Sequence, residues 1–283
     1  MNYKSGIIAR KIIELQHEDG TWGNEFHSLA MPNNHNPLTT EQALRRLKIL
    51  GFSSEDACIR KTLNCMESCL RGERRIDDYW EKTIDWSLFT KLMLSAWIRM
   101  FEPENETALI FARQWANILE KAFEGQQYSQ AVFQKVYMEE FYKSSKGSRE
   151  IDFVNFYPIN LLPGLLSQDT ESCMLDYVIH HPNGIYYIYA KPICELPEVF
   201  ESVDASRYLA AVEILCQYDS AKEKLGFVTQ WLEQNRQKDG RWDMGPKVKD
   251  NVYFPLSDSW RSPESRKADC TFRINVLLEK LKG

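Results

Sequence analysis

The sequence lacks the long apolar run that a membrane-spanning helix needs, since no stretch approaches about 18 consecutive apolar residues. Its first 16 residues are amphipathic and contain no uninterrupted apolar segment, so they do not resemble a signal peptide. Positive charge is also scarce: the 283 residues carry a formal net charge of −5, and the only basic cluster is the short run Arg71, Arg74 and Arg75. These absences argue against a membrane span and against a nucleic-acid partner.

The cysteines form no recognisable disulfide framework. They number seven, which is odd, and they lie in segments that we expect to be helical. This usage fits a reducing compartment, so we expect a cytoplasmic protein. No motif indicates a cofactor, and no feature indicates a particular oligomeric state.

What the chain does contain is apolar spacing near the helical period. Examples are the sets Ile59, Leu63, Met66 and Leu70, then Leu225, Val228 and Leu232, and finally Ile274, Leu277, Leu278 and Leu281. Thr39 and Gln42 have the spacing of a capping box, and Pro263 follows Ser262 as a first helical residue would. We therefore predict an all-α protein with about ten helices joined by short loops.

Two segments differ from this pattern. Residues 86–101 are apolar around nearly the whole helical circumference, which predicts a buried helix. Such a helix is either the inner helix of a double-layered ring or the centre of an ordinary bundle. The segment near 184–190 follows Pro182-Asn183-Gly184 and is rich in tyrosine and isoleucine, so we predict a short extended or hairpin segment there.

Two stretches near opposite ends of the chain repeat each other. Gln16-His17-Glu18-Asp19-Gly20-Thr21-Trp22 and Gln237-Lys238-Asp239-Gly240-Arg241-Trp242 each follow an amphipathic helix. Gly20 and Gly240 are suited to the left-handed backbone that ends a helix. We expect the tryptophan to fold back on its hairpin and the glutamine amide to bond backbone groups near another helix end. In the second copy the glutamine lies one residue nearer the glycine.

This pattern resembles the Gln–Trp repeat of squalene–hopene cyclases and related terpenoid cyclases, and the hairpin expected over residues 39–70 is similar to a unit of the same fold. The resemblance implies an α/α toroid, a ring of inner and outer helices shared with prenyltransferases, formed here as a single domain over residues 1–283. It covers about a fifth of the chain. In that family the repeats are structural.

The chemistry of the family is missing. The chain has no Asp-x-Asp-Asp cluster of the kind that protonates an alkene in the cyclases, and Asp269-Cys270 does not reproduce the zinc-binding Asp-x-Cys pair of the prenyltransferases. Asp77-Asp78-Tyr79-Trp80-Glu81 superficially matches a magnesium–diphosphate motif, but no second motif accompanies it. We interpret these carboxylates as a solvated acidic helix start. We therefore predict no metal site.

The most suggestive group of polar residues is C-terminal. Arg266, Asp269 and Arg273 share one face of the last helix, and the preceding proline-bounded loop adds Asp258 and Arg261. One interpretation is a surface ladder of ion pairs. The other is a charged line at a cavity mouth, where two arginines keep an aspartate ionised for a substrate. On the second interpretation Asp258, Arg261 and Asp269 are candidate catalytic residues.

The remaining candidates lie around the apolar helix and near the extended segment. Asp85 is either the N-cap of the apolar helix or a carboxylate directed into the ring, and we include it among the catalytic candidates. The candidate ligand-binding residues are mainly aromatic, because such rings stabilise flat or cationic ligands. They are Trp86, Trp97, Tyr186, Tyr187, Tyr253, Trp260, Arg266 and Arg273. His180 and His181 are either a surface pair or contain a general base.

Three functions remain open from the sequence. The leading hypothesis is a toroid protein that binds a small apolar or isoprenoid-like molecule in an aromatic-lined central cavity. The second is a glycan-acting enzyme that uses tyrosine, histidine and aspartate for acid–base chemistry. The third is a non-catalytic interaction module whose cavity is filled by its own side chains. Fold alone does not separate them.

Overall fold

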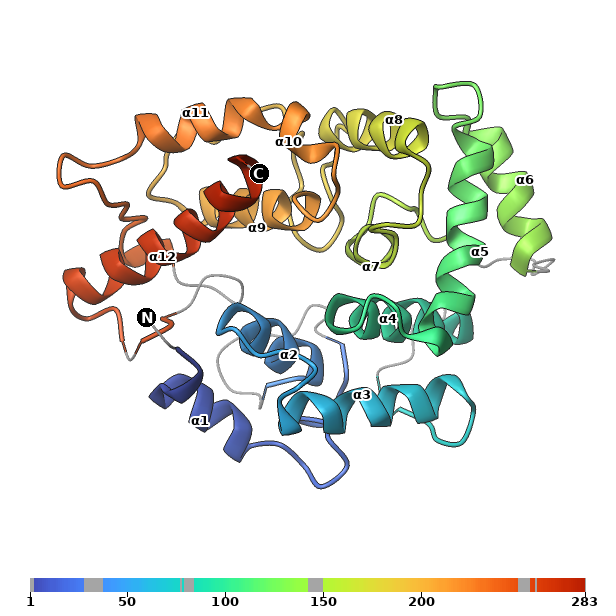
Figure 1. The fold of residues 1–283 in the computed structure, drawn as a ribbon, viewed down its shortest axis with the longest axis horizontal. Coiled ribbons are helices and arrows are strands. Elements are labelled where there is room, and N and C mark those ends of the chain that lie inside the picture. Colours follow the sequence, from blue (N-terminus) through green and yellow to red (C-terminus); the bar gives the residue numbers. More distant parts are fainter. Residues whose placement is uncertain are drawn as a thin grey trace. The chain divides into compact units, whose positions relative to one another are not determined.

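The computed structural model describes residues 3–27, 38–76, 78, 84–141, 150–248, 255–257 and 259–282. Over these residues the protein is all-helical, with no named strand, so the predicted all-α class is confirmed (Figure 1). The short 3₁₀ helices are η1 (Tyr3–Ser5) and η2 (Pro246–Val248). The α-helices are α1 (Ile7–Glu14), α2 (Thr40–Ile49), α3 (Ala57–Leu70), α4 (Trp86–Phe101), α5 (Glu106–Ala122), α6 (Gln130–Phe141), α7 (Phe156–Leu161), α8 (Gln168–Ile179), α9 (Val203–Leu215), α10 (Ala221–Lys224), α11 (Gly226–Gln234) and α12 (Pro263–Lys282).

The chain forms two compact units. Unit 1 comprises residues 1–79, 197–210 and 228–280, and unit 2 comprises residues 80–196, 211–227 and 281–283. Each unit has its own buried core. A closed ring of helices and a single domain are predictions about the whole chain, and both stay predictions. No helix in the described part of the chain is both long enough and apolar enough to cross a membrane.

The helices of unit 1 begin and end where local chemistry requires. At α2, Thr39 Oγ1 accepts from the Gln42 N–H at 3.2 Å, and Gln42 Oε1 accepts from the Thr39 N–H at 3.3 Å, which confirms the capping box. Gly51 follows the end of α2 with a φ of +92°, the left-handed backbone expected there. Helix α12 begins at Pro263, as predicted.

The two tryptophan segments of unit 1 fold back in the same way. The Trp22 indole N–H donates to the carbonyl of Ile12 in α1 at 2.8 Å. The Trp242 indole N–H donates to the carbonyl of Leu232 in α11 at 2.7 Å. Both tryptophans are 1% exposed. The prediction that each ring folds back on its preceding helix is confirmed.

The backbone between each helix and its tryptophan also repeats. The N–H of His17 donates to the carbonyl of Thr21 at 2.9 Å, and the N–H of Gln237 donates to the carbonyl of Arg241 at 2.9 Å. These pairs correspond when the chain is shifted by 220 positions, the same shift that superposes Trp22 on Trp242 in sequence. We name residues 16–22 and 236–242 the first and second Trp turns.

Each Trp turn is bonded to a second helix by a threonine. The Trp22 N–H donates to Thr40 Oγ1 at 2.9 Å at the start of α2, and the Trp242 N–H donates to Thr271 Oγ1 at 3.1 Å within α12. Each hydroxyl also donates back to the tryptophan carbonyl. The Trp turn is therefore a connector between two helices, formed twice with the same set of main-chain bonds.

The side chain that supports each turn is different. In the first, the Gln16 amide donates to the carbonyls of Gly20 at 3.1 Å and Cys58 at 2.8 Å, the second of which lies in the first turn of α3. In the second, Arg236 Nε donates to the carbonyl of Gly240 at 2.7 Å. The equivalent of Gln16 is thus Arg236, and the interpretation of Gln237 as that equivalent was wrong by one residue.

In unit 2 the apolar helix is α4, which has the predicted bounds. Its central residues are buried on all sides, including Trp97 at 0% exposure, and the helix packs against α5 and α7. Its one buried cation, Arg99, donates to the carbonyls of Pro103 and Pro163 at 3.0 Å each, and also to that of Leu161. Backbone carbonyls therefore satisfy the guanidinium inside the core.

The segment near 184–190 is a tight turn closed by two isolated β-bridges. Ile185 pairs antiparallel with Tyr189, and Asn155 pairs parallel with Tyr186. The sequence predicted a short extended or hairpin segment here, and the two bridges agree with that prediction. The second bridge fixes this turn against the residues that lead into α7.

Candidate functional site

Unit 2 contains a cavity of about 430 Å³. Its wall combines the beginning of α4, the beginning of α6, the segment before α7 and the turn after α8. The described lining residues are Ile84, Phe89, Tyr128, Gln130, Phe133, Glu150, Ile151, Asp152, Val154, Asn155, His181, Asn183, Gly184, Tyr186 and Tyr187. Its volume is in the range of small-molecule sites. Aromatic rings and two carboxylates dominate, and the described lining contains no lysine or arginine.

The turn after α8 positions one wall of this cavity. The Gly184 N–H donates to the carbonyl of His181 at 3.0 Å, and the Ile185 N–H donates to the carbonyl of Tyr189 at 2.8 Å. Gly184 has a φ of +57°, and a Cβ there would collide with the carbonyl oxygens of Tyr189 and Lys191. Only glycine therefore allows this close turn.

Tyr187 has an unusual backbone. Its φ of +76° is rare for a residue with a large side chain and costs of order 1–3 kcal/mol. Main-chain bonds hold the turn in place, because the Tyr186 N–H donates to Val154 and the Tyr186 carbonyl accepts from Phe156, both at 3.2 Å. Strained residues of this kind cluster at binding sites, where surrounding structure imposes them.

A chain of ring contacts joins Tyr187 to the lining residue Phe89. Tyr187 contacts Tyr157 edge-on with ring centroids 5.6 Å apart, and Tyr157 contacts Phe89 edge-on at 5.3 Å. Tyr186 and Tyr187 lie 4.1 Å apart, and 51% of Tyr186 is exposed. The cavity thus has an aromatic side on which Tyr186 is the most exposed ring.

A second aromatic cluster contributes Tyr128 and Phe133 to the lining. Tyr128 lies 4.6 Å from Tyr177, 5.1 Å from Phe153 and 6.0 Å from Phe133, measured between ring centroids. Burial raises the pKa of Tyr128 well above its usual range, and the charges of Asp152, Tyr177 and Glu150 raise it further. The phenol therefore stays neutral, and its hydroxyl donates to Gln130 Oε1 at 2.8 Å.

His181 is held in one orientation at the edge of the cavity. Its Nδ1 lies 3.2 Å from the carbonyl of Gly184, which requires that this nitrogen carry the hydrogen, because a carbonyl only accepts. In the neutral ring, Nε2 is then the acceptor. The ring lies 5.6 Å from Tyr177. The site thus combines aromatic faces, two carboxylates and one imidazole ring.

The aromatic residues predicted to bind a ligand divide between the cavity wall and the buried core. Tyr186 and Tyr187 line the cavity, whereas Trp97 is fully buried against Phe156 at 5.6 Å and is not among the lining residues. Trp86 is half-buried and contacts the lining residue Phe89 at 5.1 Å.

Asp85 is the N-cap of α4. Its Oδ1 accepts from the Leu88 N–H at 2.8 Å, which is the first of the two roles that the sequence allowed. A catalytic role for Asp85 stays a prediction.

The C-terminal candidates lie in unit 1. Asp269 is 1% exposed and accepts hydrogen bonds from the hydroxyl of Tyr3 at 3.0 Å and the indole N–H of Trp260 at 2.9 Å. It also accepts from the N–H of Leu256 at 2.9 Å and from the N–H and hydroxyl of Ser257 at 3.3 and 3.1 Å. Burial raises the pKa of Tyr3 above its usual range, and Asp269 adds to this. The carboxylate joins the N-terminal segment, the loop and α12.

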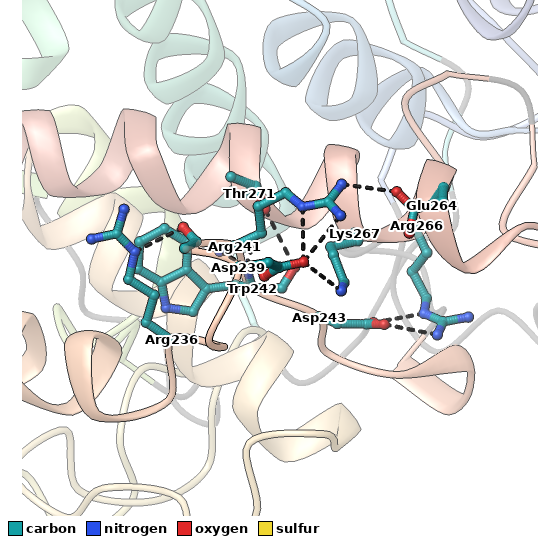
Figure 2. Close-up of polar contacts among 10 residues, drawn as sticks. Arg236, Asp239, Arg241, Trp242, Asp243, Glu264, Arg266, Lys267 and Thr271 are labelled. Atoms are coloured by element: carbon teal, nitrogen blue, oxygen red, sulfur yellow. Dashed lines mark hydrogen bonds and ion pairs between the residues drawn. The ribbon is translucent and has the colours of Figure 1, made fainter.

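The sequence predicted that Arg266 lies beside Asp269, but in the structure Arg266 pairs with another carboxylate. Arg266 binds Asp243 with both Nε and Nη2, at 2.7 and 2.9 Å, and this pair is largely buried (Figure 2). Burial opposes ionisation of Asp243, but the Arg266 and Gly245 hydrogen bonds outweigh it and leave the pKa of this carboxyl lowered. Helical spacing placed Arg266 on one face of α12, but its partner is Asp243, the residue that follows the second Trp turn.

The other C-terminal candidates are described only in part. Arg273 is buried and has polar or electrostatic contacts of its own, and Arg261 is exposed. Tyr253 and Asp258 lie outside the described residues. Figure 2 shows Arg241 and Lys267 converging on Asp239. The interpretation of Arg266, Asp269 and Arg273 as a surface ladder was wrong, because all three residues are buried.

The acidic motif near residue 78 also differs from its interpretation. Asp77, Tyr79, Trp80 and Glu81 lie outside the described residues, but the side chain of Asp78 is 2% exposed and its Oδ1 lies 2.6 Å from His27 Nδ1. Asp78 is therefore a buried partner of a histidine. It is not a solvated carboxylate at a helix start.

The cavity residues that sequence reasoning missed include Tyr128, Phe133, Glu150 and Asp152. They come from two segments that carry no motif, and the cavity exists only because α6 and the residues before α7 converge on the turn after α8. The clearest sequence signal was that turn itself, with its glycine and tyrosines.

Comparison with known proteins adds no assignment: no family model matches the chain, and neither a curated protein nor a solved structure matches it.

Proposed function

We propose that this protein binds a small organic molecule in the aromatic cavity of unit 2, and that the preferred ligand carries a positive charge next to apolar groups. The observation that carries this proposal is the composition of the wall. Phe89, Tyr128, Phe133, Tyr186 and Tyr187 face a cavity that also contains the carboxylates of Glu150 and Asp152. Aromatic faces and carboxylates both attract cations.

An isoprenoid diphosphate fits this wall less well. Diphosphates are bound by arginine, lysine, metal ions or helix N-termini. The described lining has no basic side chain other than His181, and its two carboxylates would repel the ligand. We therefore keep the hypothesis of a ligand with apolar groups, which came from the sequence. We no longer propose a ligand with an anionic diphosphate.

A neutral carbohydrate is the second candidate. Tyr186 presents an exposed ring, and carboxylates and a histidine acceptor lie in the same cavity, as a glycan site requires. Glu150 and Asp152 come from one short segment. This placement supports carbohydrate binding more than the two-sided carboxylate arrangement of a glycosidase.

The resemblance to terpenoid cyclases supports the proposal only at the level of architecture. The two Trp turns have the same main-chain bonds, which supports a chain built from repeated helical hairpins. A divergent α/α toroid without the cyclase chemistry is our proposed architecture. A reducing, cytoplasmic location is the proposed compartment, supported by seven free cysteines.

The test is calorimetric titration of the full chain with choline and with 3,3-dimethylbutan-1-ol, a neutral molecule of nearly the same shape. We expect choline to bind at least about ten times more tightly, since a desolvated cation–π contact contributes about 2 kcal/mol. Equal affinities would contradict the cationic preference. Tighter binding of dimethylallyl diphosphate or of a methyl glycoside would replace the proposed ligand class.

Variants locate the binding. Tyr186→Leu and Asp152→Asn should each weaken choline binding several-fold, because they remove an accessible ring and a carboxylate from the wall. Ile110→Ala and Asp169→Asn are matched controls: Ile110 is 68% exposed on α5, and neither residue lines this cavity. Binding that survives both cavity variants, or that the controls reduce equally, would show that the cavity is not the site.

A further inference from the structure

Unit 1 contains a second pocket, of about 300 Å³, next to the first Trp turn. Its described lining includes Asp19 and Thr21 from that turn, Thr40 from the start of α2, Cys65 from α3 and Arg74 from the segment after α3. Its chemistry differs from that of the unit 2 cavity, because it brings a thiol and a guanidinium to the same small space. Nothing in the proposed ligand site of unit 2 uses these groups.

The thiol has a second thiol beside it. Cys65 and Cys69 are one helical turn apart on α3, and their side chains are hydrogen-bonded. The hydrogen bond from Cys69 lowers the pKa of Cys65 to about 7, against the opposing effect of burial, and Arg74 lowers it further. The same hydrogen bond, together with burial, raises the pKa of Cys69. The first proton of the pair is therefore lost easily, and the second is retained on the other sulfur.

The cation near the thiols is paired with a carboxylate, and 42% of its side chain is exposed. Arg74 Nη2 lies 2.7 Å from Asp19 Oδ2, and Asp19 Oδ1 accepts from the Thr21 N–H at 2.9 Å and the Thr21 hydroxyl at 2.6 Å. Asp19 thereby orients Arg74 while reducing its net attraction for the thiols. A positioned cation beside an ionisable thiol is the arrangement that makes a cysteine reactive.

We propose that Cys65 and Cys69 form a peroxide-reactive dithiol site, in which Cys65 is the nucleophile and Cys69 is the resolving thiol. The Cys65 thiolate attacks one oxygen of a hydroperoxide, the O–O bond breaks, and the leaving alkoxide or hydroxide takes a proton from water. Cys65 is then a sulfenic acid. The Cys69 sulfur loses its proton and attacks the Cys65 sulfur, and the departing hydroxyl leaves as water. The two thiols supply the two electrons that reduce the peroxide.

The position of Cys69 makes the second step feasible. A disulfide needs Cβ atoms about 3.5–4.5 Å apart, whereas residues four apart on a helix have Cβ atoms about 5–6 Å apart. The helix must therefore relax locally. Helix α3 ends at Leu70, so Cys69 lies in its last turn, and Gly72 with a φ of +76° follows immediately. Unwinding this one turn disturbs few helical hydrogen bonds.

The experiment treats the reduced full-length protein with one equivalent of hydrogen peroxide at pH 7, blocks remaining thiols with iodoacetamide and digests with trypsin. Cleavage after Lys61 and Arg71 leaves both cysteines on the peptide Thr62–Arg71. We expect this peptide to lose the mass of two hydrogen atoms while the Cys194 peptide is alkylated. A thiol with a pKa near 7 is about half ionised at pH 7, compared with a few per cent for an ordinary cysteine, so oxidation should be about ten times faster.

Cys194 is the exposure control, because it is the exposed cysteine of the chain. If Cys194 is oxidised first, or if the Thr62–Arg71 peptide remains reduced, the proposal is wrong. In Cys69→Ser we expect a sulfenic acid at Cys65 that dimedone traps, and in Cys65→Ser we expect Cys69 to stay reduced. Oxidation of Cys69 at the wild-type rate in Cys65→Ser would reverse the assignment and contradict the proposed roles.

Arg74→Gln and Arg75→Gln form a matched pair, because only Arg74 lines the pocket. We expect the first to slow oxidation several-fold and the second to leave it unchanged. If both substitutions slow oxidation equally, Arg74 has no special effect on the thiols, and its proposed role is wrong. Circular dichroism of every variant verifies that it is folded, and the wild-type oxidation rate between pH 5 and 9 provides a test that needs no variant. This rate should rise around pH 7.

Discussion

The first and second Trp turns share their backbone but differ in their supports. In both, the indole N–H donates to a carbonyl ten residues earlier, and a threonine on another helix binds the tryptophan backbone. The support is a neutral amide in the first turn and a guanidinium in the second. Gln16 reaches α3, whereas Arg236 lies over the ring of Trp242, 4.9 Å from its centroid, and near Glu233.

This difference shows which parts of the motif are essential to its geometry. The turn needs a residue that tolerates positive φ and a large ring with one donor, and these features occur in both copies. The supporting side chain needs only a donor that reaches the glycine carbonyl, so two chemically different residues serve. Both turns lie in unit 1, which allows their contributions to be compared within one folded unit.

The largest effect is expected from removing the rings. Trp22→Ala and Trp242→Ala should each lower the free energy of unfolding by about 3–5 kcal/mol, because each empties a fully buried site and loses a buried hydrogen bond. Urea unfolding followed by circular dichroism measures this. If one variant costs less than about 1 kcal/mol, the two turns are not equivalent anchors.

The glycines should separate the two copies. Gly20 has a φ of +93°, and a Cβ there would lie 2.7 Å from the carbonyl oxygen of Lys61, whereas a Cβ at Gly240, with a φ of +80°, would meet only the Arg236 side chain at 3.6 Å. Gly240→Ala should cost roughly 1–2 kcal/mol, the ordinary cost of left-handed backbone. Gly20→Ala should cost more, because the α3 backbone must move.

Gly51→Ala is the control for this pair, since Gly51 has a φ of +92° and no atom within 4 Å of the added Cβ. It should behave like Gly240→Ala in the same urea measurement. Equal costs at all three positions would mean that α3 yields easily to Gly20→Ala.

Removing the supports should have a smaller effect. Gln16→Ala should cost about 1–2 kcal/mol, because its part-buried amide bonds two carbonyls and the hydroxyl of Thr62. Arg236→Ala should cost less than about 1 kcal/mol, since the guanidinium is more exposed. A larger loss for Arg236→Ala would show that the cation–π contact, and not the number of hydrogen bonds, determines the strength of the support.

The smallest effect is expected in the dependence of folding stability on acidic pH. A hydrogen bond from Lys267 lowers the pKa of Asp239 to about 2. At Asp19 burial opposes ionisation, but the Thr21 hydrogen bonds and Arg74 lower the pKa overall. Both folded pKa values lie below that of the unfolded chain, about 3.9. The stabilisation is therefore present above about pH 4 and is lost as pH falls toward 2.

Asp19→Asn and Asp239→Asn should each flatten the loss of stability between pH 5 and 2.5, measured as the urea midpoint at each pH. Asp152→Asn, which changes a carboxylate of unit 2, should leave the slope of the unit 1 transition unchanged. If the urea midpoint of both unit 1 variants falls with pH as steeply as in the wild type, other carboxylates cause the acid sensitivity.

Local chemistry allowed much of the helical fold to be predicted. The bounds of α4, the capping box at Thr39 and the proline start of α12 agree with the structure, because each depends on residues close together in the chain. The pairing of Arg266 could not be predicted in this way. Helical spacing makes Asp269 its neighbour, but Asp243 is brought to it by the second Trp turn, and a bidentate contact outcompetes a same-face pair.

The candidate site was predictable only in part. Tyr186 and Tyr187 were identified from a glycine turn and a tyrosine cluster, whereas Trp97 has the same aromatic character and lies in the core. Ring type alone does not distinguish a cavity wall from a core, since both favour large apolar groups.

By itself the sequence determined the all-helical class, the principal helix boundaries and the two glycine–tryptophan turns, because periodicity, capping and backbone freedom act over a few residues. Only the tertiary structure decided that Tyr128, Glu150 and Tyr187 share one cavity and that Cys65 lies beside Arg74 in another. Those groupings depend on how separate segments pack. Packing follows from the summed burial of many side chains, which no single motif records.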